Sequence, residues 1–428
     1  MRNFFAISLV LAFGAVAPAQ NAASDLAFKI PRLYGQNGLI LPNPFHGAHF
    51  ESSFQQSFTP MNAAVGSQLA LLPFASPASG LIYNFNTSAG VYTRSSQTLG
   101  PVIAERGETI GRHRLFLGVA YQYFKFDKID GIDLKNVPVV FTHQQETGAP
   151  YERDIITAQN SIALNINQYT AVATFGLTDR LDISAAIPIL TVHLGVVSNA
   201  SIDRIAPPDP VFGQAHYFDA ADPQNSTRKT FNSHGTATGL GDITFRLKGT
   251  IWHGERGSLA LAADVRTPTG DQYNFLGTGA VGFKPFLIAS YRQGRIAPHV
   301  NMGFQWNGSS TVAGDLSTNT SRRLPRQFVY AAGADIGATK RLTIAFDLLG
   351  SRVFNGPRVS KTTVTDARGT TFQDIRLDRS SFNLLDFSSG FKLNVTRNLL
   401  LTANVITQLN DAGLRARIIP LVGWSYTF

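Results

Sequence analysis

Long stretches of alternating apolar and polar residues constrain the fold of this chain more than any other feature. Most are ten or more residues long, and 399–410 shows the pattern, with one face made of Leu399, Leu401, Ala403, Val405, Thr407 and Leu409. A period of two indicates β-strands, because successive side chains of a strand point to opposite faces. Strands in soluble sheets usually have about five or six residues, so these strands are unusually long.

Twelve such stretches follow one another after residue 111. They are 112–126, 161–177, 181–200, 239–252, 258–269, 280–292, 297–308, 326–338, 342–354, 381–395, 399–410 and 414–428. The short links 178–180, 253–257, 293–296, 339–341 and 396–398 alternate with the long links 127–160, 201–238, 270–279, 309–325 and 355–380; the last link, 411–413, is a short exception. This rhythm is typical of outer-membrane barrels, which have short periplasmic turns and long outer loops.

We therefore predict an all-β fold, a transmembrane antiparallel β-barrel of about twelve strands. Lipid accepts an apolar face on every strand, and closure pairs the strand edges that lipid cannot satisfy. Fourteen strands are the alternative count, with 81–86 and 90–99 as one more hairpin. A soluble β-sandwich is the alternative fold, but aromatic residues near strand ends favour a membrane interface: Tyr121, Tyr123, Trp252, Tyr291, Trp306, Trp424 and Tyr426.

The chain divides into three expected segments. Residues 1–19 carry a positive charge, a short apolar run and an A-x-A site, which is the pattern of a secretory signal peptide. Residues 20–111 are irregular and rich in Gly, Pro, Ser and Asn, and we expect a plug-like segment at the periplasmic mouth or inside the barrel, with a short helix over 61–72. Residues 112–428 form the barrel.

The last strand is apolar on one face to its final residue. This face is made of Val422, Trp424, Tyr426 and Phe428. It is similar to the terminal signal of Gram-negative outer-membrane proteins, which ends in Phe after alternating apolar residues. The resemblance implies that these residues are an assembly signal and that the barrel assembly machinery is a partner.

Three further stretches carry a family resemblance. They are "GLGDITFRLK" (239–248), "RTPTGD" (266–271) and "PVIAERGETIGRHRLFLGVAYQY" (101–123). They resemble the outer-membrane family associated with the meta-cleavage pathway of phenol degradation, which is distantly similar to long-chain fatty-acid and toluene uptake channels. The resemblance implies a channel in the bacterial outer membrane for passive uptake of small hydrophobic or aromatic solutes.

Alternation also directs charged side chains into the lumen. The candidate lining residues are Asp242, Arg246, Lys248, Asp264, Arg266, Asp335, Asp347, Lys392, Arg415 and Arg417. They either shape what passes or simply pair with one another. Inward apolar residues either contact an apolar solute or pack against the plug: Phe116, Phe124, Val172, Leu190, Phe286 and Ile288.

Composition and motifs narrow the remaining classes. The chain has no cysteine, and its formal net charge of +9 suits anionic lipid or lipopolysaccharide better than nucleic acid in an exported protein. We expect no cofactor and no metal site, and His46 and His49 are read as loop histidines. We also expect no enzyme activity, since His193, Ser198 and His299 lie in no nucleophile motif. A general or anion-leaning porin and a structural or surface-binding barrel stay as alternative functions.

Overall fold

The structure, a computed structural model, describes residues 25–44, 47–48, 50–51, 58–69, 83–86, 91–94, 98–143, 153–211, 213–316, 318–396 and 398–428. The expected signal peptide and the histidines His46 and His49 lie outside these residues. In the described part of the chain, no helix has the length and hydropathy needed to cross a membrane.

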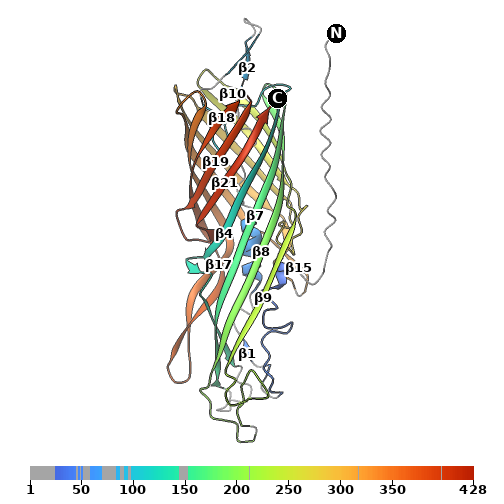
Figure 1. The fold of residues 1–428 in the computed structure, drawn as a ribbon, viewed down its shortest axis with the longest axis vertical. Coiled ribbons are helices and arrows are strands. Elements are labelled where there is room, and N and C mark those ends of the chain that lie inside the picture. Colours follow the sequence, from blue (N-terminus) through green and yellow to red (C-terminus); the bar gives the residue numbers. More distant parts are fainter. Residues whose placement is uncertain are drawn as a thin grey trace.

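Twelve long strands form a closed antiparallel ring in the described part of the chain (Figure 1). They are β4 (Leu115–Ile129), β7 (Ile155–Thr178), β8 (Leu181–Asp203), β10 (Thr244–His253), β11 (Gly257–Arg266), β12 (Gly282–Tyr291), β13 (Ile296–Asn307), β16 (Arg326–Gly337), β17 (Leu342–Thr365), β18 (Thr371–Thr396), β19 (Leu399–Gln408) and β21 (Ile418–Thr427). Each pairs with the next, and β21 pairs with β4 to close the ring. The predicted barrel and its twelve strands are confirmed.

The outer face of the ring is apolar. Along β21 the exposed and buried residues alternate, and Trp424 and Phe428 keep 60% and 58% of their surface accessible. The same face of β10 exposes Phe245, Leu247 and Trp252. Since about 25 cal/mol is lost per Å² of apolar surface left in water, a band of this kind requires lipid. The closed ring and its apolar outer face are those of a membrane-spanning β-barrel.

The remaining described strands are not members of the ring. They are β1 (Phe50–Glu51), β5 (Ile132–Asp133), β6 (Val137–His143), β9 (Arg228–Leu240), β14 (Ser309–Asp315), β15 (Thr320–Arg323), β20 (Leu414–Ala416), and the pair β2 (Tyr83–Asn86) and β3 (Val91–Arg94). The fourteen-strand alternative does not hold, because β2 and β3 form a separate two-stranded sheet.

The two ends of the barrel differ. We call the end with the short links, where the C-terminus lies, the turn end and the opposite end the loop end (Figure 1). At the loop end the β7–β8 and β17–β18 pairs continue well beyond the other strands of the ring (Figure 1). By analogy with outer-membrane barrels in general, short links face the periplasm.

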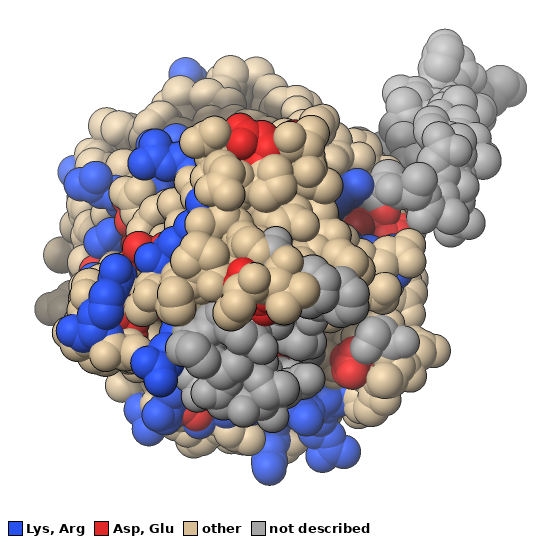
Figure 2. Space-filling model, turned by 90° about the horizontal axis from the view of Figure 1, so that it is seen from below, with Lys and Arg blue, Asp and Glu red and all other residues tan. Residues whose placement is uncertain are grey.

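Basic side chains gather along one side of the loop end (Figure 2). Arg322 and Arg323 of β15 are exposed. Partial burial and the nearby positive charge of Arg322 lower the pKa of Arg379 on β18. The contact of this end with lipopolysaccharide stays a prediction.

Some described parts of the N-terminal segment lie inside the barrel, whereas β2 projects beyond the turn end (Figure 1). A short 3₁₀ helix, η1 (Leu26–Phe28), is bonded to the link after β11 through Ala27 N and Tyr273 O, 2.8 Å apart. The helix α2 (Phe58–Leu69) lies in the lumen against β14 and β17. It starts before the predicted residue 61, since Pro60 fits a first helical turn, where its missing N–H leaves no bond unmade.

Gly176 on β7 lies against Gly111, the last residue of the N-terminal segment. An added Cβ there would lie 1.9 Å from the carbonyl oxygen of Gly111, whereas at Gly195 on β8 the nearest atoms are 4.0 Å away. Gly176→Ala must therefore displace backbone, and we expect a loss of about 1–3 kcal/mol in unfolding free energy. Gly195→Ala is the matched control and should change it by less than about 0.5 kcal/mol.

The measurement is urea unfolding followed by the gel mobility of the folded and unfolded barrel. Equal stability of the two variants would show that Gly111 does not lie against β7.

Candidate functional site: the lumen and its plug

Residues 98–111, the plug segment, cross the lumen near the turn end. Nearly all of them are buried. Backbone N–H groups donate to side chains of four different strands: Leu99 to Thr343 on β17 (2.8 Å), Glu105 to Asn301 on β13 (2.7 Å), Gly107 to Ser290 on β12 (3.1 Å) and Ile110 to Asp182 on β8 (3.0 Å). The wall thus supplies hydrogen-bond acceptors to four backbone N–H groups of a segment that has no regular structure. Buried backbone N–H groups need such partners.

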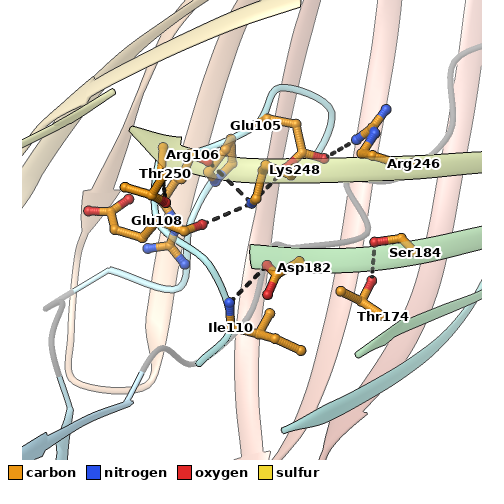
Figure 3. Close-up of polar contacts among 12 residues, drawn as sticks. Glu105, Arg106, Glu108, Ile110, Thr174, Asp182, Ser184, Arg246, Lys248 and Thr250 are labelled. Carbon is orange, nitrogen blue, oxygen red and sulfur yellow. Dashed lines mark hydrogen bonds and ion pairs between the residues drawn. The ribbon is translucent and has the colours of Figure 1, made fainter. Parts of the chain in front are cut away.

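Wall side chains also donate to plug carbonyls (Figure 3). Lys248 Nζ lies 2.8 Å from Glu108 O, and Thr250 Oγ1 lies 2.6 Å from Gly107 O. On the opposite wall Lys392 Nζ donates to Pro101 O. The plug segment is therefore held from both sides of the lumen.

A buried charge cluster joins the plug to the wall. The Arg246 guanidinium donates through Nε and Nη2 to Asp264, at 2.6 and 2.8 Å, and through Nη1 to Glu105 Oε1 at 2.5 Å. Lys284 lies 3.0 Å from Asp264, and Lys248 lies 3.5 Å from Glu105. Bidentate Arg–carboxylate pairs are strong and directional. Removing one partner of such a buried set costs about 3–5 kcal/mol, because it leaves a charge uncompensated.

A second buried group contains His299. Its Nε2 lies 2.6 Å from Asp347, and its Nδ1 lies 3.4 Å from Asp335. His299 therefore sits between two carboxylates rather than beside a nucleophile. His193 is exposed on β8 and contacts Thr236, whereas Ser198 is buried and contacts Tyr34. The three residues weighed for an enzyme site do not come together.

Asp242 holds the link between β11 and β12, at the loop end, by hydrogen bonds. Its carboxylate accepts from Gly270 N at 3.1 Å and from Thr278 N at 2.8 Å, and Arg266 Nε lies 3.5 Å away. Nine of the ten predicted lining residues are buried inside the ring, where they pair with one another, pair with His299 or Asp386, or hold the plug: Asp242, Arg246, Lys248, Asp264, Arg266, Asp335, Asp347, Lys392 and Arg415. Their influence on what passes stays a prediction.

The prediction for Arg417 is wrong. Strict alternation from Arg415 would turn it inward, but its side chain is exposed. The register shifts between Arg415 and Ala416, and the sheet breaks between β20 and β21. A bulge adds one residue to a strand, so the residues beyond it change faces.

Two of the cavities formed by the described residues lie in the lumen beside the end of α2. The larger, of about 140 Å³, is lined by Gln68, Val329, Leu349, Gly350, Ser351, Leu384, Asp386, Ile406, Arg415, Ala416 and Ile419. The smaller, of about 70 Å³, is lined by Leu69, Gln168, Thr170, Ala186, Pro188, Leu190, Asp242, Thr244, Arg266, Leu276 and Gly277. Both combine apolar side chains with a few charged groups, which is the make-up of small-molecule sites.

The predicted inward apolar residues are buried as well. Phe116, Phe124, Val172, Leu190, Phe286 and Ile288 are at most 7% accessible. Phe116 and Val172 pack with Ile110 of the plug segment, so at this point the plug interpretation holds.

Sequence reasoning missed the plug contacts themselves. Glu105 and Glu108 lie in a segment with no period, so no face was assigned to them. The available signal was the run Glu105-Arg106-Gly107-Glu108, four residues with three charges in an otherwise weakly charged region.

Comparison with solved structures finds other barrels at low similarity. An outer-membrane channel from Pseudomonas putida F1 is 13% identical, over 76% of this chain and 100% of that chain, with a TM-score of 0.44. The P. putida toluene transporter TodX is 11% identical over 76% and 91%, with a TM-score of 0.34. A Pseudomonas aeruginosa FadL homologue is 11% identical over 83% and 99%, with a TM-score of 0.32. Likenesses this weak carry no argument about function.

Curated protein sequences give no match to this chain. A family model does match, over residues 140–413, which is more than half of the 428 residues. The matched range runs from β6 to the link before β20 and so includes ten of the twelve ring strands. The chain belongs to the family described as "Putative MetA-pathway of phenol degradation".

Proposed function

We propose that this protein is an outer-membrane channel for the passive uptake of small hydrophobic or aromatic compounds, and not an enzyme. One observation carries the proposal: a polar plug bonded to the wall crosses the lumen, while small, partly apolar cavities remain beside it. Membership of a family linked to phenol degradation supports the same solute class.

The geometry favours this function over a general porin. A porin needs a continuous water-filled path, whereas here the plug segment is buried and bonded to β8, β12, β13 and β17. An apolar solute needs no such path. It gains about 0.8 kcal/mol for each buried CH₂ group, so it partitions into apolar cavities without an energy source.

The wall and plug residues each have a part in such passage. The Arg246–Glu105 and Lys392–Pro101 contacts keep the plug across the lumen and exclude water. The apolar side chains lining the cavities hold the solute between the two ends. Release toward the turn end then requires some displacement of residues 98–111.

The plug is tested by single-channel conductance in a planar bilayer. We expect the unmodified protein to be nearly closed, and Glu105→Gln to raise the frequency of openings by at least about tenfold. The reason is that Arg246 and Lys248 then lose a negative partner, and every 1.4 kcal/mol changes a population tenfold. Glu255→Gln, in an exposed turn, is the matched control and should leave the openings unchanged.

Steady, large, ohmic steps from the unmodified protein would contradict the plugged channel and indicate a porin.

Solute selectivity is tested by uptake into cells of a Gram-negative host. Cells that produce the protein should take up ¹⁴C-toluene faster than cells that do not, with no change for ¹⁴C-sucrose, because a plugged lumen offers no water path to a sugar. Equal increases for both solutes would support the porin, and no increase for either would support a structural barrel.

A further inference from the structure

The larger cavity has the volume of a single small ring. An apolar protein cavity of about 150 Å³ holds one benzene molecule, and this cavity measures about 140 Å³. Val329, Leu349, Leu384, Ile406 and Ile419 supply an apolar surface from five different strands. A six-membered ring therefore fits, and a fused two-ring system does not.

One side of this cavity is polar. Arg415 is 96% buried, with 4% of its side chain accessible, and its Nη2 donates to Leu385 O at 3.0 Å and to Asp386 Oδ1. Arg415 also lines the cavity, so an acceptor atom brought into the cavity can take a hydrogen bond from its guanidinium group, which carries five N–H donors.

The Asp386 carboxylate makes the site favour a neutral ligand. Asp386 already neutralises the charge of Arg415, so an anionic solute would have to displace the Asp386 carboxylate, whereas a neutral solute would not. Asp386 keeps 22% of its side chain accessible, so it can accept a bond from a donor on the ligand. A hydroxyl group supplies both an acceptor for Arg415 and a donor for Asp386.

The fold places Arg415 here for a local reason. The register shift between Arg415 and Ala416 breaks the alternation of the last strand, so that Arg415 and Ala416 both line the cavity. Gln68, at the end of α2, lines the cavity from the plug side. The cavity thus has walls from the barrel and from the N-terminal segment.

We infer that the larger cavity is a binding site for one neutral, single-ring aromatic molecule with a hydroxyl group, whose oxygen accepts a hydrogen bond from the Arg415 guanidinium and whose O–H donates a hydrogen bond to Asp386. This inference rests on the proposed function for the general solute class. It adds the place, the size limit and the polar group that is recognised.

The test is ligand-observed ¹⁹F NMR on the full chain in detergent, with 4-fluorophenol, fluorobenzene, 4-fluorobenzoate and 6-fluoro-2-naphthol as probes. We expect 4-fluorophenol to bind about tenfold to hundredfold more tightly than fluorobenzene, since hydrogen bonds to charged groups are the stronger ones. The anionic and two-ring probes should bind more weakly than 4-fluorophenol. Equal binding of 4-fluorophenol and fluorobenzene would overturn the inference.

Variants connect this preference to the cavity. Arg415→Met with Asp386→Leu removes both charges, leaves none unpaired, and should abolish the preference while fluorobenzene still binds. Arg417→Met, at an exposed position between β20 and β21, is the matched control and should keep the preference. Ser351→Leu should fill the cavity and weaken both ligands. Gel mobility of the folded barrel verifies each variant.

If the variant with both Arg415→Met and Asp386→Leu still binds 4-fluorophenol more tightly than fluorobenzene, the inference is overturned, even if toluene uptake is observed. The converse is also distinguishable: hydroxyl-selective binding without any uptake would keep the site and contradict the channel.

Discussion

The need to pair every backbone polar group in lipid determines the rest of this structure. Lipid offers no hydrogen bonds, so a sheet that crosses it must close on itself. Here β21 closes the ring by pairing Leu421–Thr427 with Phe116–Gln122 of β4. Closure then divides the side chains: those facing out contact lipid and are apolar, and those facing in have only the lumen in which to find partners.

The same requirement explains the plug. Inward residues such as Arg246, Lys248 and Asp264 are charged and buried, so each needs a partner of opposite charge or a carbonyl. The wall supplies some of these partners to itself, as in the Arg246–Asp264 pair. The plug segment supplies others through Glu105 and the carbonyls of Arg106 and Glu108. Plug and wall are therefore complementary, and the closed lumen follows from that complementarity.

The sequence specified the barrel well because its signal is repeated in every strand. Period-two alternation located most ends of the twelve ring strands to within a few residues, although β17 runs to Thr365 and β18 begins at Thr371, both inside the predicted link 355–380. It also directed nine of ten named charges inward. It failed where the period breaks. Beyond the bulge at Arg415 it assigned Arg417 to the wrong face, and it extended one strand across 239–252.

In the structure that strand is interrupted, because β9 ends at Leu240 and β10 begins at Thr244. Gly241 passes so close to Pro188 and Leu190 that a Cβ would clash, and Asp242 leaves the ladder to hold the link 270–278. Part of the stretch 239–248, which carried the family resemblance, is thus an interruption between two strands. The contacts of the plug could not be predicted, since an irregular segment has no period from which to assign a face.

Amide hydrogen exchange of residues 98–111 in native outer-membrane vesicles tests the central claim most directly. The account predicts that the amides of Leu99, Glu105, Gly107 and Ile110, which donate to wall side chains, resist exchange for hours. Exchange of these amides within seconds, at the rate of exposed backbone, would contradict a plug bonded across the lumen.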